Sequence, residues 1–176
     1  MNKKIKCRIK GISPLLMHAY PMQPVEAIEK KSSDEQAEYA AYRNPKGKLY
    51  IPSVALQRSI IGAATYTKGK GRASLQKPVA ACVLVSPEYL ILDQQEYVID
   101  ARPVVIPKTQ GRVVRFRPRF NEWSIESIIE FDDVLLKESE LKKIIDDAGS
   151  RVGLLDFRPE RKGPFGRFMV IDWKSI

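Results

Sequence analysis

The stretch on which the fold depends reads Gly149-Ser150-Arg151-Val152-Gly153-Leu154-Leu155-Asp156-Phe157-Arg158-Pro159, then Gly163-Pro164-Phe165-Gly166-Arg167-Phe168, and ends in Met169-Val170-Ile171-Asp172-Trp173. The pattern predicts a helix that stops at Gly149, a loop rich in glycine, proline and basic residues, and a β-strand that closes the chain. Because glycine lacks a Cβ, Gly153, Gly163 and Gly166 let a partner approach the main chain closely. The basic residues of the loop are Arg151, Arg158, Arg161, Lys162 and Arg167.

Exposed N–H groups and guanidinium groups in one loop suit a phosphate backbone or another acidic surface. An ordinary connection, in which Asp156 and Glu160 pair with neighbouring arginines, fits the same residues equally well. The rest of the chain has to decide between these two interpretations.

Residues 3–12 alternate between apolar and basic side chains, which is typical of a strand with one buried face. The apolar face carries Ile5, Cys7 and Ile9, and the opposite face is entirely cationic. Its members are Lys4, Lys6, Arg8 and Lys10. Four like charges on one face repel one another, so we expect a neutralising partner nearby.

A second basic alternation runs from Arg112 to Phe120 and predicts the first strand of a hairpin. The chain turns over residues 120–123, and the apolar positions Trp123, Ile125, Ile129 and Phe131 continue the core face of the returning strand. In that register Glu126 lies across from Arg117, so part of the arginine row is internally paired. Two arginines of this row remain free, namely Arg115 and Arg119.

The remaining elements are two main helices, further strands and two polar segments. Helices are expected over 53–66, with Ser53 as the N-cap, and over 139–148. Strands are expected over 79–85, 89–92 and 97–106, and Pro103 predicts that the last lies at an edge or contains a bulge. A polar insertion with two short helices, 24–31 and 34–42, covers about 21–48. A basic, flexible loop covers about 67–77 and carries Lys68, Lys70 and Arg72; it suits phosphate contacts, or it is a solvated linker.

This order of elements is that of the ferredoxin-like α+β fold, in which two helices cover one face of an antiparallel sheet. A chain of 176 residues is expected to form one such domain. The first and third strands are central in this topology. We therefore expect the two basic rows to lie side by side on the open face, where they require an anionic partner.

The net charge of +9 points to nucleic acid, or less often to an anionic membrane, as that partner. No apolar run is long enough for a membrane-spanning helix, so no membrane partner is expected. Cys7 and Cys82 are interpreted as reduced thiols of a cytoplasmic protein. With one histidine and no paired-cysteine motif, neither a metal site nor a cofactor is expected.

Short motifs along most of the chain resemble the RAMP superfamily, RRM-like proteins that form backbone and processing subunits of CRISPR effector complexes. The motifs are Ser13-Pro14-Leu15-Leu16-Met17-His18, Ile51-Pro52-Ser53-Val54-Ala55-Leu56-Gln57-Arg58, and Asp156-Phe157-Arg158-Pro159 with Phe165-Gly166-Arg167-Phe168. They look most similar to small RAMP-like proteins of phages and mobile elements. The helix entry departs from the family, since Ser53 and Gln57 stand where a glycine and a lysine are common. The resemblance implies an RRM-like fold, nucleic-acid binding and assembly of several copies along one strand.

The leading hypothesis is a non-enzymatic protein that binds the backbone of single-stranded RNA or DNA, together with copies of itself or other subunits. The residues expected to contact nucleic acid are Lys4, Lys6, Arg8, Lys10, Arg58, Lys68, Lys70, Arg72, Arg112, Arg115, Arg117, Arg119, Arg158, Arg161, Lys162 and Arg167. An alternative is a metal-independent endoribonuclease of the RAMP type, with His18 as general acid or base. A third is an assembly protein whose basic face meets an acidic protein.

Overall fold

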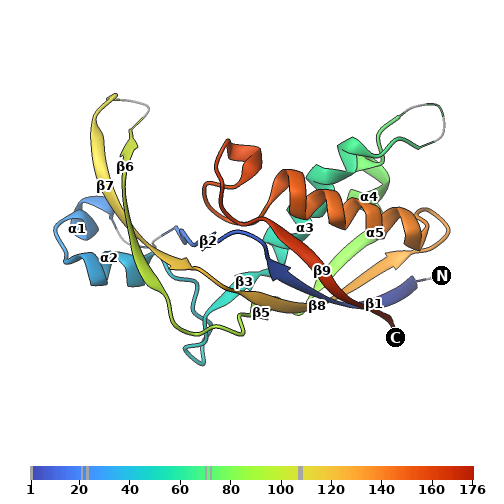
Figure 1. Cartoon of the computed structure of the whole chain (residues 1–176), viewed down its shortest axis with the longest axis horizontal. Helices are drawn as coiled ribbons and strands as arrows, with labels where there is room; N and C mark the ends of the chain where they lie inside the picture. Colours follow the sequence, from blue (N-terminus) through green and yellow to red (C-terminus); the bar gives the residue numbers. More distant parts are fainter. Residues whose placement is uncertain (1, 21, 23, 70, 72, 107–108) are drawn as a thin grey trace.

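The computed structural model describes residues 2–20, 22, 24–69, 71, 73–106 and 109–176. These residues form strands and helices in an α+β arrangement (Figure 1). The strands are β1 (Asn2–Gly11), β2 (Leu15–Leu16), β3 (Tyr50–Pro52), β4 (Val83–Ser86), β5 (Tyr89–Ile91), β6 (Val98–Val105), β7 (Arg112–Phe120), β8 (Ser124–Asp132) and β9 (Phe168–Ser175). The helices are α1 (Val25–Glu29), α2 (Ser33–Tyr39), α3 (Ser53–Ala63), α4 (Gln76–Cys82) and α5 (Glu138–Asp147), with short turns η1 (Ala64–Tyr66), η3 (Ala148–Val152) and η4 (Pro159–Arg161). Among the described residues, the strands β4 to β8 follow one another without a helix between them.

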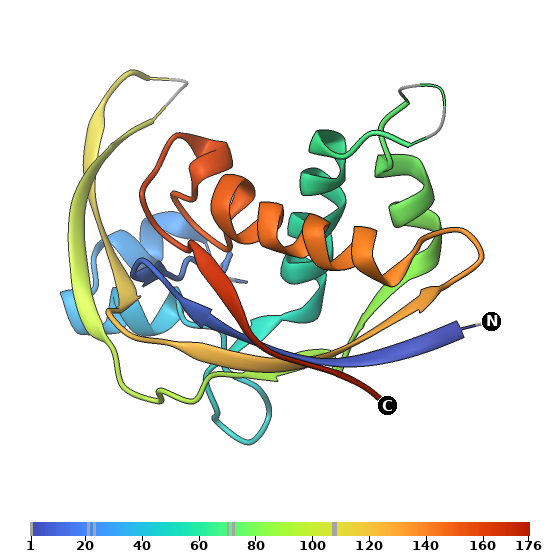
Figure 2. The ribbon, with the colours of Figure 1, turned by 45° about the vertical axis from the view of Figure 1, so that its right-hand side comes forward.

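The main sheet has the strand order β4-β8-β1-β9, and its three pairs are antiparallel. With α3 after β1 and α5 after β8, this is the ferredoxin-like topology that the sequence predicts. Both helices lie on the same face of the sheet (Figure 2). Along the described part of the chain, no helix covers the opposite face.

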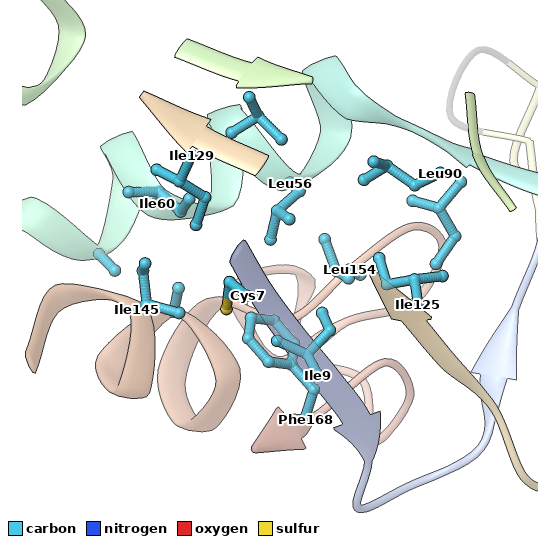
Figure 3. Close-up of a cluster of buried hydrophobic side chains, with 14 of the residues drawn as sticks. Cys7, Ile9, Leu56, Ile60, Leu90, Ile125, Ile129, Ile145, Leu154 and Phe168 are labelled. Carbon is cyan, nitrogen blue, oxygen red and sulfur yellow. The ribbon is translucent and has the colours of Figure 1, made fainter. Parts of the chain in front are cut away.

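The core lies between the sheet and these two helices. Ile5, Cys7 and Ile9 of β1 are buried, as the alternation predicts, and so are Leu56 of α3 and Ile145 of α5 (Figure 3). Burial first, and then the negative charges of Asp146 and Asp172, raise the pKa of the Cys7 thiol to about 12. Cys7 is therefore a protonated core residue.

The two central strands of the main sheet are β1 and β8. The predicted hairpin between residues 112 and 131 is wrong. β7 pairs with β6 and β2 in a second sheet, while Glu126 of β8 lies opposite Arg8. The strand β8 lies between β1 and β4, and its inward side chains, including Ile125 and Ile129, are buried in the core. Residues 121–123 thus carry the chain from one sheet to the other. The two basic rows do not lie side by side.

The β6–β7 ribbon extends away from the main sheet, and α1 and α2 lie beside it (Figure 1). Pro103 is on β6, an edge strand of the β2-β7-β6 sheet, as predicted. The insertion at 21–48 contains α1 and α2. At the start of α2, Ser32 and Glu35 form a capping box in which each side chain bonds to the other's backbone N–H.

Several predicted boundaries are wrong. The helix α5 does not stop at Gly149 but continues as the π-helical turn η3, which ends at Gly153 with φ of 76°. Gly149 instead allows close packing, because a Cβ there would lie 2.1 Å from the carbonyl oxygen of Phe168. Ser53 is the first residue of α3, and Pro52 occupies the N-cap without a side-chain hydrogen bond. The helix α4 occupies 76–82, which overlaps both the predicted loop at 67–77 and the predicted strand at 79–85.

Candidate nucleic-acid interface

A hollow of 330 Å³ lies between the first turns of α3 and the loop that follows η3. The α3 side contributes Arg58 and Ser59, and the loop contributes Gly153, Leu155, Asp156 and Arg158. His18 and Tyr42 line it as well. The three motifs that carry the RAMP resemblance therefore meet around this one hollow.

The start of α3 leaves backbone N–H groups at the hollow, because its N-cap side chain makes no hydrogen bond. The N–H of Ser53 is taken by the carbonyl of Glu88. Val54 and Ala55, the next residues of the helix, line the hollow. The first turn of an 11-residue helix thus faces this space with the positive end of its dipole.

The wall opposite α3 has an unusual backbone. Leu155 and Phe157 have φ of 58° and 47°, and Gly153 and Gly166 have φ of 76° and 73°. Non-glycine residues adopt this left-handed region rarely, and such residues are common at functional sites. Here Asp156 lies between two of them, its N–H bonded to the carbonyl of Leu16. The close approach also depends on glycine, since a Cβ on Gly166 would lie 2.1 Å from the Leu154 carbonyl oxygen.

Asp156 joins the loop to the β6–β7 ribbon and to His18. Its carboxylate accepts a short hydrogen bond from Arg117 and lies 3.5 Å from Nδ1 of His18. Burial raises the pKa of the Asp156 carboxyl, but the hydrogen bonds and positive charges of His18 and Arg117 outweigh burial and hold that pKa below its usual value. Asp156 is therefore an anion that positions both basic groups.

Arg117 is the centre of a buried ionic cluster. Its side chain is 6% exposed, and its Nη2 lies 3.8 Å from the buried Asp100 on β6. Asp100 in turn accepts two hydrogen bonds from Nε of Arg102, at 2.8 and 3.0 Å. Arg119 lies 3.9 Å from the same carboxylate and 5.8 Å from the centre of the Phe165 ring. The arginines of β7 thus hold the ribbon against the C-terminal loop.

Seven of the predicted contact residues form ion pairs within the chain. On the main sheet, Lys4 pairs with Glu130, Lys6 with Glu126 and Arg8 with Asp93. On β7, Arg115 pairs with Glu29, and Arg117 and Arg119 belong to the cluster around Asp100. Arg158 pairs with Glu160 at 2.5 Å. The protein therefore supplies neutralising partners for three of the four cations of β1, namely Lys4, Lys6 and Arg8. The predictions that Arg115 and Arg119 are free and that Glu126 pairs with Arg117 are wrong.

The other predicted cations are different. Within the described ranges, no carboxylate forms an ion pair with Lys10, Arg58, Lys68, Arg112, Arg161, Lys162 or Arg167. Arg58 is the member of this group that lines the hollow. Lys70 and Arg72 lie outside the described residues, so their predicted role stays a prediction.

Sequence reasoning missed Tyr42 and Asp100, and it expected Asp156 to pair with a neighbouring arginine of its own loop and not with Arg117. Tyr42 lines the hollow, and Asp100 and Asp156 organise the arginines. Burial, and then the neighbouring Tyr50 and Asp156, raise the pKa of the Tyr42 hydroxyl. For Asp156, the signal in the sequence is its position inside the Asp156-Phe157-Arg158-Pro159 motif. Asp100 gives no such signal, because its partners come from strand pairing.

Comparison with solved structures supports the fold. The chain is similar to a chain in the cryo-electron microscopy structure of a type III-B Cmr-beta complex bound to cognate target RNA, with a TM-score of 0.57 and 10% identity. The alignment covers 99% of this chain and 61% of that chain. A likeness at this identity shows a shared α+β architecture. No family model and no curated protein sequence matches the chain.

Two further properties bear on the class of protein. Among the described residues, none of the helices has the length and apolar character needed to cross a membrane. The same part of the chain contains no group of three or more histidine, cysteine, aspartate or glutamate side chains placed to hold a metal ion.

Proposed function

We propose that this protein binds single-stranded RNA through its sugar–phosphate backbone at the hollow between α3 and the C-terminal loop. The observation that carries the proposal is that Arg58, which has no ion-pair partner among the described residues, lines the same hollow as the uncapped start of α3. Both features favour an anion, the first by a charged donor and the second by backbone N–H groups and the helix dipole.

The loop that forms one wall of the hollow carries further cations. Arg161, Lys162 and Arg167 are exposed, and no carboxylate within the described ranges forms an ion pair with them. Cationic side chains along a path that tracks a strand give backbone binding with little dependence on base sequence. This fits a subunit that repeats along an RNA, with other copies or other subunits beside it. The likeness to a chain of an RNA-bound complex supports RNA as the nucleic acid.

A salt titration of oligonucleotide affinity tests the proposal. Single-stranded RNA, single-stranded DNA and duplex are compared by fluorescence anisotropy for the wild type and for Arg58→Gln. Loss of one phosphate contact should weaken RNA binding and lower the slope of log affinity against log salt by about 0.7. Lys46→Gln, which removes an exposed charge from the turn after α2, is the matched control. If the slope of log affinity against log salt is unchanged in Arg58→Gln, the hollow is not the RNA-binding site. Equal affinity for single-stranded DNA would show that the protein binds both nucleic acids.

RNA cleavage is a second candidate, favoured by the arrangement around His18. Its Nδ1 lies 3.5 Å from Asp156, which leaves Nε2 as the nitrogen for proton transfer with a ribose 2′-hydroxyl. Tyr42 and Arg58 line the same hollow and offer a proton donor and a cation for the phosphate. The presence of Tyr42 and Arg58 in the lining that contains His18 supports this second candidate.

Incubation of labelled RNA with a chelating agent present separates the two candidates. The binding proposal expects intact RNA and nearly unchanged affinity in His18→Ala. Products that end in a 2′,3′-cyclic phosphate, formed by the wild type and absent with His18→Ala, would establish the nuclease. A 2′-deoxy substitution at the cut site is the substrate control, because it removes the attacking hydroxyl.

A further inference from the structure

We infer that a second hollow, between α2 and β7, is a pocket for one nucleobase of the bound strand. The inference deepens the proposed function and rests on it. This hollow measures 180 Å³. Pockets for drug-sized ligands measure about 300–1,000 Å³, so the space suits one flat ring system.

The lining combines aromatic rings with polar groups. Tyr20, Tyr39 and Phe116 supply aromatic surface, on which any base can stack. Gln36 and Arg115 line the same space. Pockets of this composition, apolar with a few polar groups that set orientation, are typical of small-ligand sites.

The polar groups have capacity left for a base edge. The side-chain nitrogen of Gln36 donates to the carbonyl of Lys31, and its oxygen accepts no hydrogen bond from the described residues. Arg117, whose side chain is 6% exposed, also lines the pocket, and its buried Nε has no hydrogen-bond partner within the described ranges. A buried donor without a partner costs free energy that a ligand acceptor would recover.

The position of the pocket connects it to the phosphate hollow. His18 lines both the base pocket and the phosphate hollow, so the two cavities are neighbours. A nucleotide carries its base and its phosphate on the same sugar. One strand can therefore place a phosphate beside Arg58 and a base beside Tyr20 and Gln36.

The pocket walls are held in place. The Ser32–Glu35 capping box fixes the start of α2, and Arg115 bonds to Glu29 of α1 at 3.0 Å across the ribbon. A pre-formed pocket costs little ordering on binding. The insertion at 21–48 therefore has a role in this inference, because it forms one wall of the base pocket.

The test compares a short RNA with a ribose–phosphate oligomer of equal length that lacks all bases. We expect the wild type to bind RNA more tightly, and Tyr20→Ala with Gln36→Leu to weaken RNA binding roughly tenfold. Affinity for the base-free oligomer should stay nearly unchanged, because the phosphate contacts remain. Tyr20 is 81% exposed, so its removal leaves the fold intact, and Tyr20→Phe should retain RNA affinity. The control is Tyr66→Ala, which removes another exposed tyrosine from η1.

The outcomes separate this inference from the proposed function. If the double variant weakens both oligomers equally, or neither, the base pocket is excluded while backbone binding stands. Arg58→Gln should weaken both oligomers, which no loss of base stacking does. If the wild type binds neither oligomer, the proposed function is wrong, and the inference about the base pocket is then wrong as well.

Discussion

The strands β1 and β7 carry the same alternation of basic side chains in two different settings. On β1, the side chains of Lys4, Lys6 and Arg8 keep 43–54% of their surface exposed on the open sheet face. On β7, Arg117 keeps 6% and sits between carboxylates of two other segments. Exposed pairs contribute little to stability, whereas removing one partner of a buried pair leaves a desolvated charge behind.

The number of basic residues in a row of the sequence therefore does not measure the charge available to a ligand. Most cations of both rows pair with carboxylates. Lys4, Lys6 and Arg8 do so on the sheet surface, and Arg117 and Arg119 do so in the buried cluster. The unpaired cations assigned to RNA binding lie on α3 and in the C-terminal loop. Four experiments test whether the two rows differ in this way.

The largest expected effect is on stability, in Arg117→Met. Methionine keeps the aliphatic length but leaves Asp156 and Asp100 without this cation, so the free energy of unfolding should fall by about 3 kcal/mol. Urea denaturation followed by circular dichroism measures it. Arg112→Met, an exposed position on the same strand, should have little effect and serves as the control. A loss no larger than that of the control would mean that the cluster does not hold the ribbon to the loop.

A smaller loss is expected for Asp156→Asn, because Arg117 keeps Asp100 as a partner. The folded-state pKa of Asp156 lies below the ordinary 3.8, so its contribution is present above that pH and is lost as pH falls through the folded-state value. The stability difference between wild type and variant should be constant near neutral pH and shrink below pH 3.8. Urea titrations across this range give the measurement. Glu122→Gln is the control, and a difference that grows on acidification would contradict the assignment.

The third experiment exposes the cations of β1. Glu126→Gln with Glu130→Gln removes the partners of Lys6 and Lys4, which lie at 3.0 and 3.4 Å. If pairing is what keeps this face from binding RNA, the slope of log affinity against log salt should steepen by up to about 1.4. Glu96→Gln with Glu122→Gln makes the same change in net charge at two exposed glutamates that pair with neither Lys4 nor Lys6. Equal steepening in both double variants would show a general charge effect.

The smallest effect is expected in Lys6→Met. The Lys6–Glu126 pair is exposed on both sides, so the free energy of unfolding should change by less than about 1 kcal/mol. Added salt should narrow even this difference. Urea denaturation at two salt concentrations measures it, with Arg117→Met beside it as the contrasting case. A loss comparable to that of Arg117→Met would remove the distinction between the two strands.

The order of elements could be predicted because it depends on local patterns. The alternation around Ile5, Cys7 and Ile9 predicts β1, and the helices expected over 53–66 and 139–148 correspond to α3 and α5. The order of these and the other elements indicates the ferredoxin-like fold. The predicted end of α5 at Gly149 is wrong. A glycine can lie inside a helical segment where close packing against another segment requires the absence of a Cβ. There the close approach of Phe168 requires glycine inside the turn.

The sequence by itself determined the fold class, the excess of positive charge and the motifs that surround the phosphate hollow. Only the tertiary structure decided that β8 and not β7 enters the main sheet, which carboxylates neutralise the basic rows, and that His18 lies between two hollows. The physical reason is that alternation specifies which face of a strand is buried but not which strand lies beside it. Ion pairing between distant segments follows from that choice, and so does the charge left for a ligand.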